Sequence, residues 1–415
     1  MSPRSVSTTA VAPPDRPRGE WPGRGIDLDR LRDVGWRPAP FREFVLKLHS
    51  RCNLACDHCY VYESADQSWR ARPTAMSAAV IDATAARIAE HARAHGLTEV
   101  GVVLHGGEPL LAGPRTIESV ARGLRAVAPA GCRVDISVQT NGVLLTEPML
   151  RLLARHDIGV SVSLDGDRAA HDRHRRHADG RGSHTRVMRG LSLLSGPYRR
   201  LYRGLLCTVD LANDPVETYE ALLETAPPKV DLLLPHGSWG SPPPGLDPGR
   251  GDATPYADWL AAVFDRWYRA PRRETGIRFL EEIINLILGG RSRSESIGLS
   301  PVALVVVDTD GTLQQVDTLK TSFAGAPETG LTVTEHPFDD ALGHPGVVAR
   351  QIGLSALPVT CLRCPVRDVC GGGYYVHRYR PGDGYRNPSV YCRDLRRLIE
   401  HISHEIRRDL ARLTG

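Results

Sequence analysis

The chain has 415 residues, of which 41% are hydrophobic and 24% are charged, and its formal net charge at pH 7 is +4. This length and apolar content suffice for one large globular domain with a smaller one beside it. The net charge is too small to indicate a nucleic-acid partner. The apolar runs are too short to span a bilayer, so we expect no membrane association.

Residues 1–35 are predicted to form a flexible N-terminal tail. The first 25 residues are rich in Pro, Gly and Arg and contain no apolar stretch of signal-peptide length. We therefore expect a cytoplasmic protein. Seven of the nine cysteines fall into two clusters, which points to bound metal rather than to disulfides. The other two, Cys132 and Cys207, lie in or beside apolar segments and are expected to be buried core residues.

Residues 36–240 alternate short apolar runs with amphipathic helical stretches. A helix predicted from Ser77 opens on a good N-cap and closes at Gly96. Because only a helical crossover can join parallel neighbours, this order predicts an α/β fold with a parallel sheet. The pattern alone does not separate a barrel from a doubly wound sheet. The six strand candidates are residues 44–48, 100–105, 133–140, 159–164, 203–209 and 229–236.

Two further segments are expected after this core. Residues 241–298 are predicted to be a linker, beginning with a Pro- and Gly-rich loop, and two bridging helices at about 255–269 and 273–288. Residues 299–415 are predicted to form a smaller domain. It would contain a hairpin over 303–317, a cysteine-rich segment and a helix from about Pro388 to Leu413.

The stretch "SRCNLACDHCY" (50–60) places Cys52, Cys56 and Cys59 in one short loop directly after the first predicted strand. Three thiolates can hold three corners of a four-iron four-sulfur cluster and leave one iron open, whereas a structural zinc site needs four protein ligands. The carboxyl end of a parallel strand is also where α/β proteins bind ligands. A zinc loop with a distant fourth ligand is the alternative interpretation.

This C-x3-C-x2-C loop resembles the signature of the radical S-adenosylmethionine (SAM) enzymes. The resemblance covers roughly residues 40–235 and implies a partial (β/α)6 barrel. It also implies that the amino and carboxylate groups of SAM chelate the open iron. In that family SAM is then split to a 5′-deoxyadenosyl radical.

Four more motifs at strand ends carry the same resemblance: "HGGEP" (105–109), "QTNGVLL" (139–145), "SLDG" (163–166) and "HDRHR" (171–175). The first is similar to the motif that holds the methionine amino group of SAM. Ser163 would bond the ribose or the carboxylate, and Arg175 would pair with the carboxylate as a charge-assisted fork. The cofactor-binding residues implied by the resemblance are Tyr60, Gly106, Gly107, Glu108, Gln139, Asn141, Ser163 and Arg175.

The C-terminal segment contains four more cysteines with the spacing C-x2-C-x5-C and a fourth after twenty-one residues. Four thiolates can close a cluster completely, and a zinc ribbon is the alternative. The spacing resembles the second auxiliary cluster of the SPASM extension, which occurs in radical SAM enzymes that modify peptides and proteins. The predicted ligands are Cys361, Cys364, Cys370 and Cys392.

The chain departs from a full SPASM domain. At the places where cysteines of a first auxiliary cluster would stand, it has Ser300 or its neighbours, Val316 and Tyr374. The first auxiliary cluster is therefore expected to be absent, which leaves two four-iron clusters in all. Asp317 matches an aspartate that takes a proton from the substrate in the related anaerobic sulfatase maturases. A turn or capping carboxylate is the alternative interpretation of this residue.

The cysteine-free hairpin and the segments "CPVRDVCGGGYYVHRYR" and "NPSVYC" are similar to the FxsB-type branch of radical SAM/SPASM proteins. This resemblance implies that the enzyme joins an aromatic ring to the Cβ of a nearby residue in a ribosomal precursor peptide, forming a cyclophane. It also implies an external electron donor of flavodoxin or ferredoxin type. The alternatives are a formylglycine-forming sulfatase maturase, a peptide thioether former, and a non-catalytic iron–sulfur protein that binds peptides.

Overall fold

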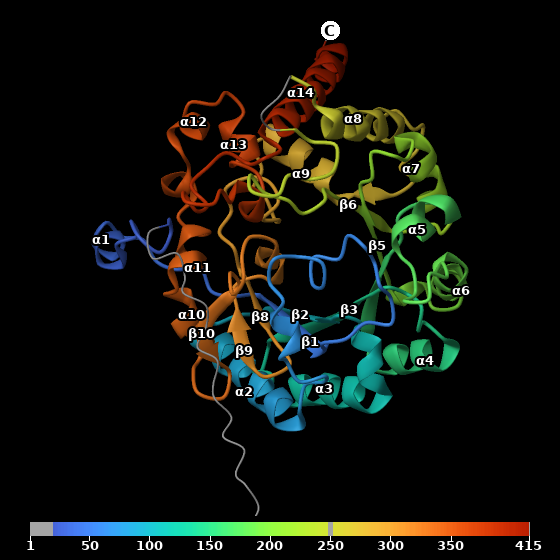
Figure 1. The fold of residues 1–415 in the computed structure, drawn as a ribbon, viewed down its shortest axis with the longest axis vertical. Coiled ribbons are helices and arrows are strands. Elements are labelled where there is room, and N and C mark those ends of the chain that lie inside the picture. Colours follow the sequence, from blue (N-terminus) through green and yellow to red (C-terminus); the bar gives the residue numbers. More distant parts are fainter. Residues whose placement is uncertain (1–19, 248–251, 415) are drawn as a thin grey trace, which may run out of the picture.

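The structure is a computed structural model that describes residues 20–247 and 252–414. Its centre is a ten-stranded sheet in the order β10-β9-β8-β1-β2-β3-β4-β5-β6-β7 (Figure 1). All six predicted strands are confirmed, with small shifts at their ends. They are β1 (Glu43–His49), β2 (Glu99–Gly106), β3 (Arg133–Thr140), β4 (Ile158–Ser163), β5 (Tyr202–Thr208) and β6 (Lys229–Leu233).

The strand order separates the two architectures that the sequence pattern leaves open. Strands β1 to β6 pair in parallel in sequence order, so every crossover helix lies on the same face of the sheet. A doubly wound sheet would reverse its order at a switch point. The two outer strands, β10 and β7, are not paired with each other. The fold is therefore an open, partial barrel, as predicted.

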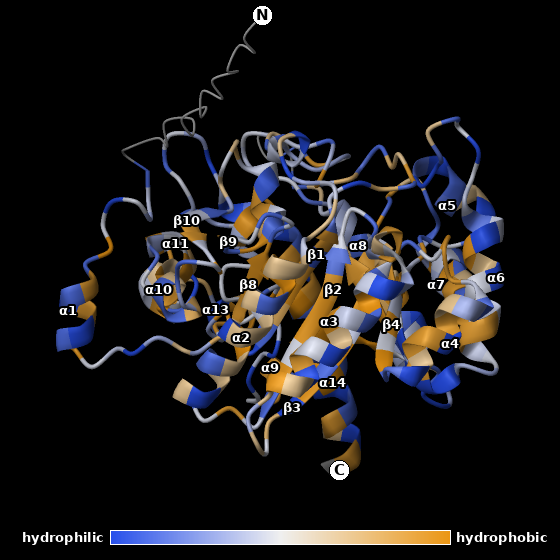
Figure 2. Cartoon of the chain, turned by 90° about the horizontal axis from the view of Figure 1, so that it is seen from below, coloured by the Kyte–Doolittle hydropathy of each residue, from blue (hydrophilic) through white to orange (hydrophobic). Residues whose placement is uncertain are grey.

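The crossover helices cover the outer face of this sheet, with their apolar stripes turned toward the strands (Figure 2). The helix predicted from Ser77 is present, and the Ser77 hydroxyl accepts a hydrogen bond from the Val80 N–H. The crossover helices are α2 (Ala78–Ala94), α3 (Gly113–Val127), α4 (Glu147–Arg155), α5 (Arg168–His174), α6 (His184–Ser195) and α7 (Pro215–Leu223).

The predicted hairpin belongs to the same sheet as the barrel strands. Strand β8 (Leu304–Val307) pairs in parallel with β1, and β9 (Thr312–Gln314) and β10 (Glu328–Thr332) follow in antiparallel order. Leu313 and Val307 are buried in the main core. One continuous sheet thus joins the first and last thirds of the chain, and the 3-10 helix η4 (Asp317–Thr321) follows β9.

The remaining elements cover the two ends of the sheet. The long helix α14 buries Leu395, Leu398, Ile402 and Ile406 and packs on α8 and α9. The elements are β7 (Gly276–Ile277), α8 (Pro255–Tyr268), α9 (Arg278–Ile287), α10 (Phe338–Leu342), α11 (Pro345–Ala349), α12 (Val359–Leu362), α13 (Arg367–Cys370), the 3-10 helix η6 (Tyr375–Arg378) and α14 (Cys392–Thr414).

Part of the predicted N-terminal tail has regular structure. Residues 28–33 form helix α1, and the Asp27 carboxylate accepts a hydrogen bond from the Arg30 N–H at its start. Such a cap stabilises even a short helix. Residues 1–19 of the predicted tail lie outside the described residues. Within the described part of the chain, no helix has the length and apolar character needed to cross a membrane.

Candidate active site

The cysteine loop leaves β1 at the carboxyl end of the sheet. The Leu54 N–H donates to the Cys52 sulfur at 3.4 Å, and the Asn141 side-chain amide donates to the same sulfur at 3.5 Å. Burial raises the pKa of Cys52 to about 11 and that of Cys56 to about 12. These groups are therefore neutral thiols at pH 7, and metal binding would have to displace their protons.

Tight packing against the cysteine loop explains the two glycines of the "HGGEP" motif. A Cβ atom on Gly107 would lie 1.8 Å from the Tyr62 hydroxyl and 2.5 Å from the Arg51 carbonyl oxygen. A Cβ atom on Gly106 would lie 2.3 Å from the His49 carbonyl oxygen. The end of β2 can therefore touch the loop only with glycine at both positions.

Glu108 is fully buried, and both of its carboxylate oxygens have partners. Oε1 accepts hydrogen bonds from the Leu110 N–H at 3.1 Å and the Thr140 hydroxyl at 2.7 Å. Oε2 accepts from the Asn141 N–H at 2.9 Å. Burial is the main cause that raises the pKa of this carboxyl, to about 7. In this structure Glu108 thus ties the end of β2 to the end of β3 and holds Asn141 beside Cys52.

Of the other predicted cofactor-binding residues, Gln139 and Ser163 lie at the ends of β3 and β4, and Arg175 follows α5. Gln139 donates from Nε2 to the Ser163 hydroxyl at 3.2 Å. Arg175 forms a two-pronged ion pair with Asp165, with Nε–Oδ2 and Nη2–Oδ1 distances of 2.5 and 3.1 Å. Arg175 also lowers the pKa of Cys56. Its positive charge therefore faces the cysteine loop, where a cluster and an anionic ligand would need it.

Asp317 lies in the same site and is a buried carboxylate with two partners. Its Oδ2 accepts a hydrogen bond from the Tyr60 hydroxyl at 3.0 Å, and the Lys47 ammonium is 3.3 Å from the same atom. Burial alone would raise the pKa of Asp317, but Lys47, His105 and the Tyr60 hydrogen bond lower it to about 2. The group is therefore an anion at neutral pH, and its partners come from other elements of the fold.

Sequence reasoning missed several residues of this site. Lys47 interrupts the apolar strand β1, and a charge in a buried strand is a signal that could have identified it. His236 follows β6, and its ring centroid is 5.1 Å from that of Tyr60 and 5.9 Å from that of His377. Burial lowers the pKa of His236 to about 4 and that of His377 well below its usual value. Both imidazoles are therefore neutral at pH 7.

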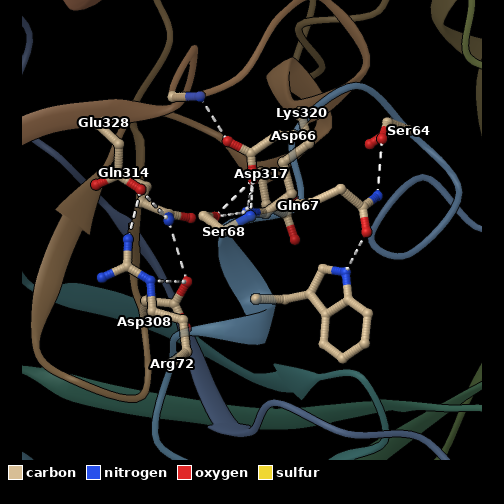
Figure 3. Close-up of polar contacts among 12 residues, drawn as sticks. Ser64, Asp66, Gln67, Ser68, Arg72, Asp308, Gln314, Asp317, Lys320 and Glu328 are labelled. Carbon is tan, nitrogen blue, oxygen red and sulfur yellow. Dashed lines mark hydrogen bonds and ion pairs between the residues drawn. The ribbon is translucent and has the colours of Figure 1, made fainter. Parts of the chain in front are cut away.

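Two groups of buried ion pairs hold the segment after the cysteine loop against the hairpin (Figure 3). The Lys320 ammonium donates to Asp66 at 3.0 Å, and both side chains are only 1% exposed. Arg72 pairs with Glu328 on β10 at 2.5 Å. Because Lys320 and Asp317 belong to the same short helix η4, this clamp fixes the position of Asp317 beside Tyr60.

Three of the four C-terminal cysteines lie in three separate helices. Cys361 lies in α12, Cys370 ends α13 and Cys392 begins α14. The Cys392 and Cys364 sulfurs both act on the pKa of Cys361, so these side chains are close together. The Arg378 guanidinium is buried beside them, lies near Cys370, and donates to backbone carbonyls of the adjacent glycine loop.

The spacing of the sulfurs bears on the choice between zinc and iron–sulfur clusters. Among the described residues, two groups bring three metal-ligating atoms within 4.8 Å of one another, and neither group contains a cysteine. Thiolates around one zinc ion would lie only about 3.8 Å apart, given a Zn–S bond of about 2.3 Å. No three of the described cysteine sulfurs lie that close to one another in this structure.

A separate cavity of about 470 Å³ lies under the N-terminal segment. Its walls include Trp21, Leu319, Phe323, Tyr375 and Tyr385. None of the predicted site residues lines it. The cavity is therefore distinct from the mouth of the barrel.

Comparison with known proteins identifies the class. Residues 46–225 match the sequence model of the Radical SAM superfamily. The open barrel and the three-cysteine loop at its mouth agree with this match. Residues 46–225 are thus similar to the radical SAM superfamily, which supports the coarser part of the predicted family. The prediction of a radical SAM enzyme is confirmed.

The relatives found among characterised proteins are sulfatase-maturating enzymes. The chain is 31% identical over 157 residues to a serine-type anaerobic sulfatase-maturating enzyme of Klebsiella aerogenes, a match that spans 38% of this chain and 37% of that one. It is 23% identical over 386 residues to the serine-type enzyme of Bacteroides thetaiotaomicron, which covers 88% and 90% of the two chains. A cysteine-type enzyme of Clostridium perfringens is 24% identical over 371 residues and covers 87% and 96%.

Solved structures show the same fold. Native anSMEcpe with bound AdoMet and Cp18Cys peptide superimposes with a TM-score of 0.73 at 20% identity, over 88% of this chain and 99% of that one. Streptococcus suis SuiB bound to its precursor peptide SuiA gives a TM-score of 0.57 at 15% identity, over 88% and 78%. The fold of this chain is thus that of radical SAM enzymes whose structures contain bound peptides.

These comparisons correct the predicted reaction. Several characterised relatives that match over most of the chain are sulfatase-maturating enzymes, so the predicted cyclophane crosslink was wrong as the main interpretation. The formylglycine-forming alternative agrees better with the relatives. The physical reason is that cysteine spacing determines which metal group can bind, whereas the bond formed on the substrate depends on what the barrel presents to it.

Proposed function

We propose that this protein is a radical SAM maturase that oxidises one serine or cysteine side chain of a protein or peptide substrate to formylglycine. The observation that carries the proposal is the similarity to sulfatase-maturating enzymes over 88% of this chain and 90% of the relative. The buried Asp317 beside Tyr60 is consistent with it, because this oxidation needs a base.

Oxidation of a serine to an aldehyde removes one hydrogen atom from Cβ, one electron, and the hydroxyl proton. When bound at Cys52, Cys56 and Cys59, an iron–sulfur cluster with SAM would supply the hydrogen-atom abstraction. Asp317 would accept the hydroxyl or thiol proton, since its carboxylate is an anion at pH 7. With a cysteine substrate the same losses give a thioaldehyde, which water hydrolyses to the aldehyde with release of hydrogen sulfide. Lys47 would keep this carboxylate anionic, and Tyr60 would fix its orientation.

We also propose that Cys361, Cys364, Cys370 and Cys392 hold a second four-iron cluster. When bound, that cluster would supply the acceptor for the second electron, and an external protein of flavodoxin or ferredoxin type would supply the reducing electron. The buried Arg378 would offset the negative charge of the thiolates, since it lies near Cys370 and Cys361. The finer assignment to the FxsB-type branch stays a prediction.

The test combines the anaerobically reconstituted, reduced enzyme with SAM and a synthetic sulfatase-derived peptide. One peptide carries the target serine, a second carries cysteine and a control carries alanine, each with deuterium at Cβ of that residue. We expect deuterium in the released 5′-deoxyadenosine and an aldehyde that reacts with a hydrazide probe, from the serine or the cysteine peptide only.

Two results would contradict the proposal in different ways. A product that has lost two hydrogen atoms but does not react with the hydrazide would be a crosslink and would exclude formylglycine formation. Intact SAM after reduction, with full iron content, would support the non-catalytic alternative.

A further inference from the structure

Away from the barrel mouth, three metal-ligating side chains converge between α2 and α10. His91 and His95 are four residues apart, so they lie on one face at the end of α2. Asp339, in the first turn of α10, faces both of them. We propose that His91, His95 and Asp339 form a zinc site that links α2 to α10.

The distances place all three ligand atoms around one point. His91 Nδ1 lies 2.5 Å from Asp339 Oδ1, and His95 Nε2 lies 3.0 and 3.1 Å from the two carboxylate oxygens. The three ligand atoms lie within 4.8 Å of one another. Ligands at about 2.0–2.2 Å from a tetrahedral zinc ion are separated by about 3.3 Å, so a small outward movement of the carboxylate would admit the ion. Asp339 can make this movement because its side chain is 45% exposed.

The imidazole of His91 is held in place by its surroundings. Its side chain is 1% exposed and contacts Phe41, Phe44 and Phe338, with ring centroids 5.8, 6.0 and 6.2 Å away. Its Nε2 is buried and has no well-formed hydrogen bond. The Phe41 backbone is nevertheless near enough to influence the pKa of the ring. An imidazole held in place, with one nitrogen turned to a carboxylate and another imidazole, matches the donor set that zinc prefers.

The site lies between two elements of the fold, away from the barrel mouth. Helix α2 runs back from the barrel mouth, so its last turn lies near the start of β2, at the opposite end of the sheet from the cysteine loop (Figure 1). Helix α10 follows β10 and packs on α2. The metal would therefore attach the segment after the hairpin to the first crossover helix. It would leave one coordination position to water.

The other group of this kind, Asp57, His58 and His174, does not support a separate site. Asp57 and His58 lie between two cysteines of the predicted cluster loop, and His174 also bonds Asp210 at 3.2 Å. These residues belong to the candidate active site already described. The proposed zinc site shares no residue with the proposed catalytic machinery.

The experiment uses the reconstituted holoenzyme, in which the cysteines are occupied by iron. The protein is equilibrated with Zn²⁺ anaerobically, excess metal is removed with a weak chelator, and zinc and iron are counted together. We expect one zinc per chain with unchanged iron, and X-ray absorption showing nitrogen and oxygen neighbours at about 2.0–2.2 Å without sulfur at about 2.3 Å.

Two variants and one matched control locate the metal. Asp339→Asn and His95→Ala should each weaken zinc binding by more than about 100-fold, since even outer-shell changes cost about 10- to 100-fold. Asp340→Asn changes the neighbouring carboxylate of α10 and should retain full binding. Zinc should raise the unfolding temperature of the wild type and of Asp340→Asn, but not of the other two.

Three outcomes would overturn the proposal: no zinc bound by the wild type, zinc retained by Asp339→Asn, or sulfur in the zinc shell. The first would mean that the three side chains form only a hydrogen-bonded group. None of these measurements uses turnover. They therefore give the same answer whether or not the protein makes formylglycine.

Discussion

The two sets of cysteines are built in different ways. Cys52, Cys56 and Cys59 lie in a single loop, and their relative positions depend on a short stretch of chain after β1. The C-terminal set instead draws Cys361, Cys370 and Cys392 from three separate helices. The first set is therefore determined locally, and the second exists only when α12, α13 and α14 are packed together. The comparison predicts that metal binding by the first set depends on its own thiolates. Metal binding by the C-terminal set should also depend on how these helices pack.

The largest expected effect is the loss of a cluster ligand from the local set. The triple variant Cys52/Cys56/Cys59→Ala should reduce iron from about eight to about four per chain and abolish SAM cleavage, because each four-iron cluster depends on its thiolates. Iron and sulfide analysis with electron paramagnetic resonance measures this. Cys132→Ala is the matched control and should keep about eight. A wild-type content of about twelve would show that other side chains build a further cluster.

Removing the proposed base should separate two steps of the reaction. Asp317→Asn should lower substrate oxidation by about 10²- to 10⁴-fold, the usual contribution of a general base. SAM cleavage by this variant should persist. Persistent cleavage would also show that the variant folds, even though Lys47 has lost its counter-ion. Asp383→Asn, an exposed carboxylate, should leave both rates unchanged. Full oxidation by Asp317→Asn would exclude this residue as the base.

The clamp between the cysteine loop and η4 should contribute strongly to stability. Lys320→Met leaves the Asp66 carboxylate buried without its cation, which should cost about 3–5 kcal/mol of unfolding free energy. Denaturant unfolding measures this. Arg396→Ala removes an exposed pair with Glu400 and should change stability by less than about 1 kcal/mol. Equal effects of the two variants would show that burial of the pair is unimportant.

The smallest expected effect comes from two glycine substitutions near the C-terminal cysteines. Comparing them separates the cost of a close contact from the cost of backbone strain. Gly371 has φ +60°, and a Cβ atom there would lie 1.8 Å from the Gly298 carbonyl oxygen. Gly382 has φ +89° and no atom within 4 Å of such a Cβ. Gly382→Ala should cost only the left-handed strain of about 1–2 kcal/mol. Gly371→Ala should lower the free energy of unfolding by more than this and should also lower the iron held at the C-terminal cysteines. Equal losses of stability in the two variants would contradict the close contact between Gly371 and Gly298.

Periodicity predicted the barrel strands well because each one is a short apolar run bounded by helices. It could not place the hairpin, because nothing local in residues 303–317 shows that β8 pairs with β1, more than 250 residues earlier. The cysteines and strand-end motifs were visible as spacings. His236 was not selected, because a single histidine acquires meaning only from the neighbours that the fold brings to it, whereas the charge of Lys47 within an apolar strand was a signal that was not used.

The sequence by itself determined the cysteine loop, the parallel α/β order and the strand-end motifs, since these depend on residues close together in the chain. Only the tertiary structure decided that Asp317 meets Tyr60 and Lys47, that Glu108 links two strand ends, and that Asp339 faces His91 and His95. Each of these contacts joins residues distant in sequence. Their energies arise from burial and charge pairing, which exist only after the sheet has brought both partners out of water.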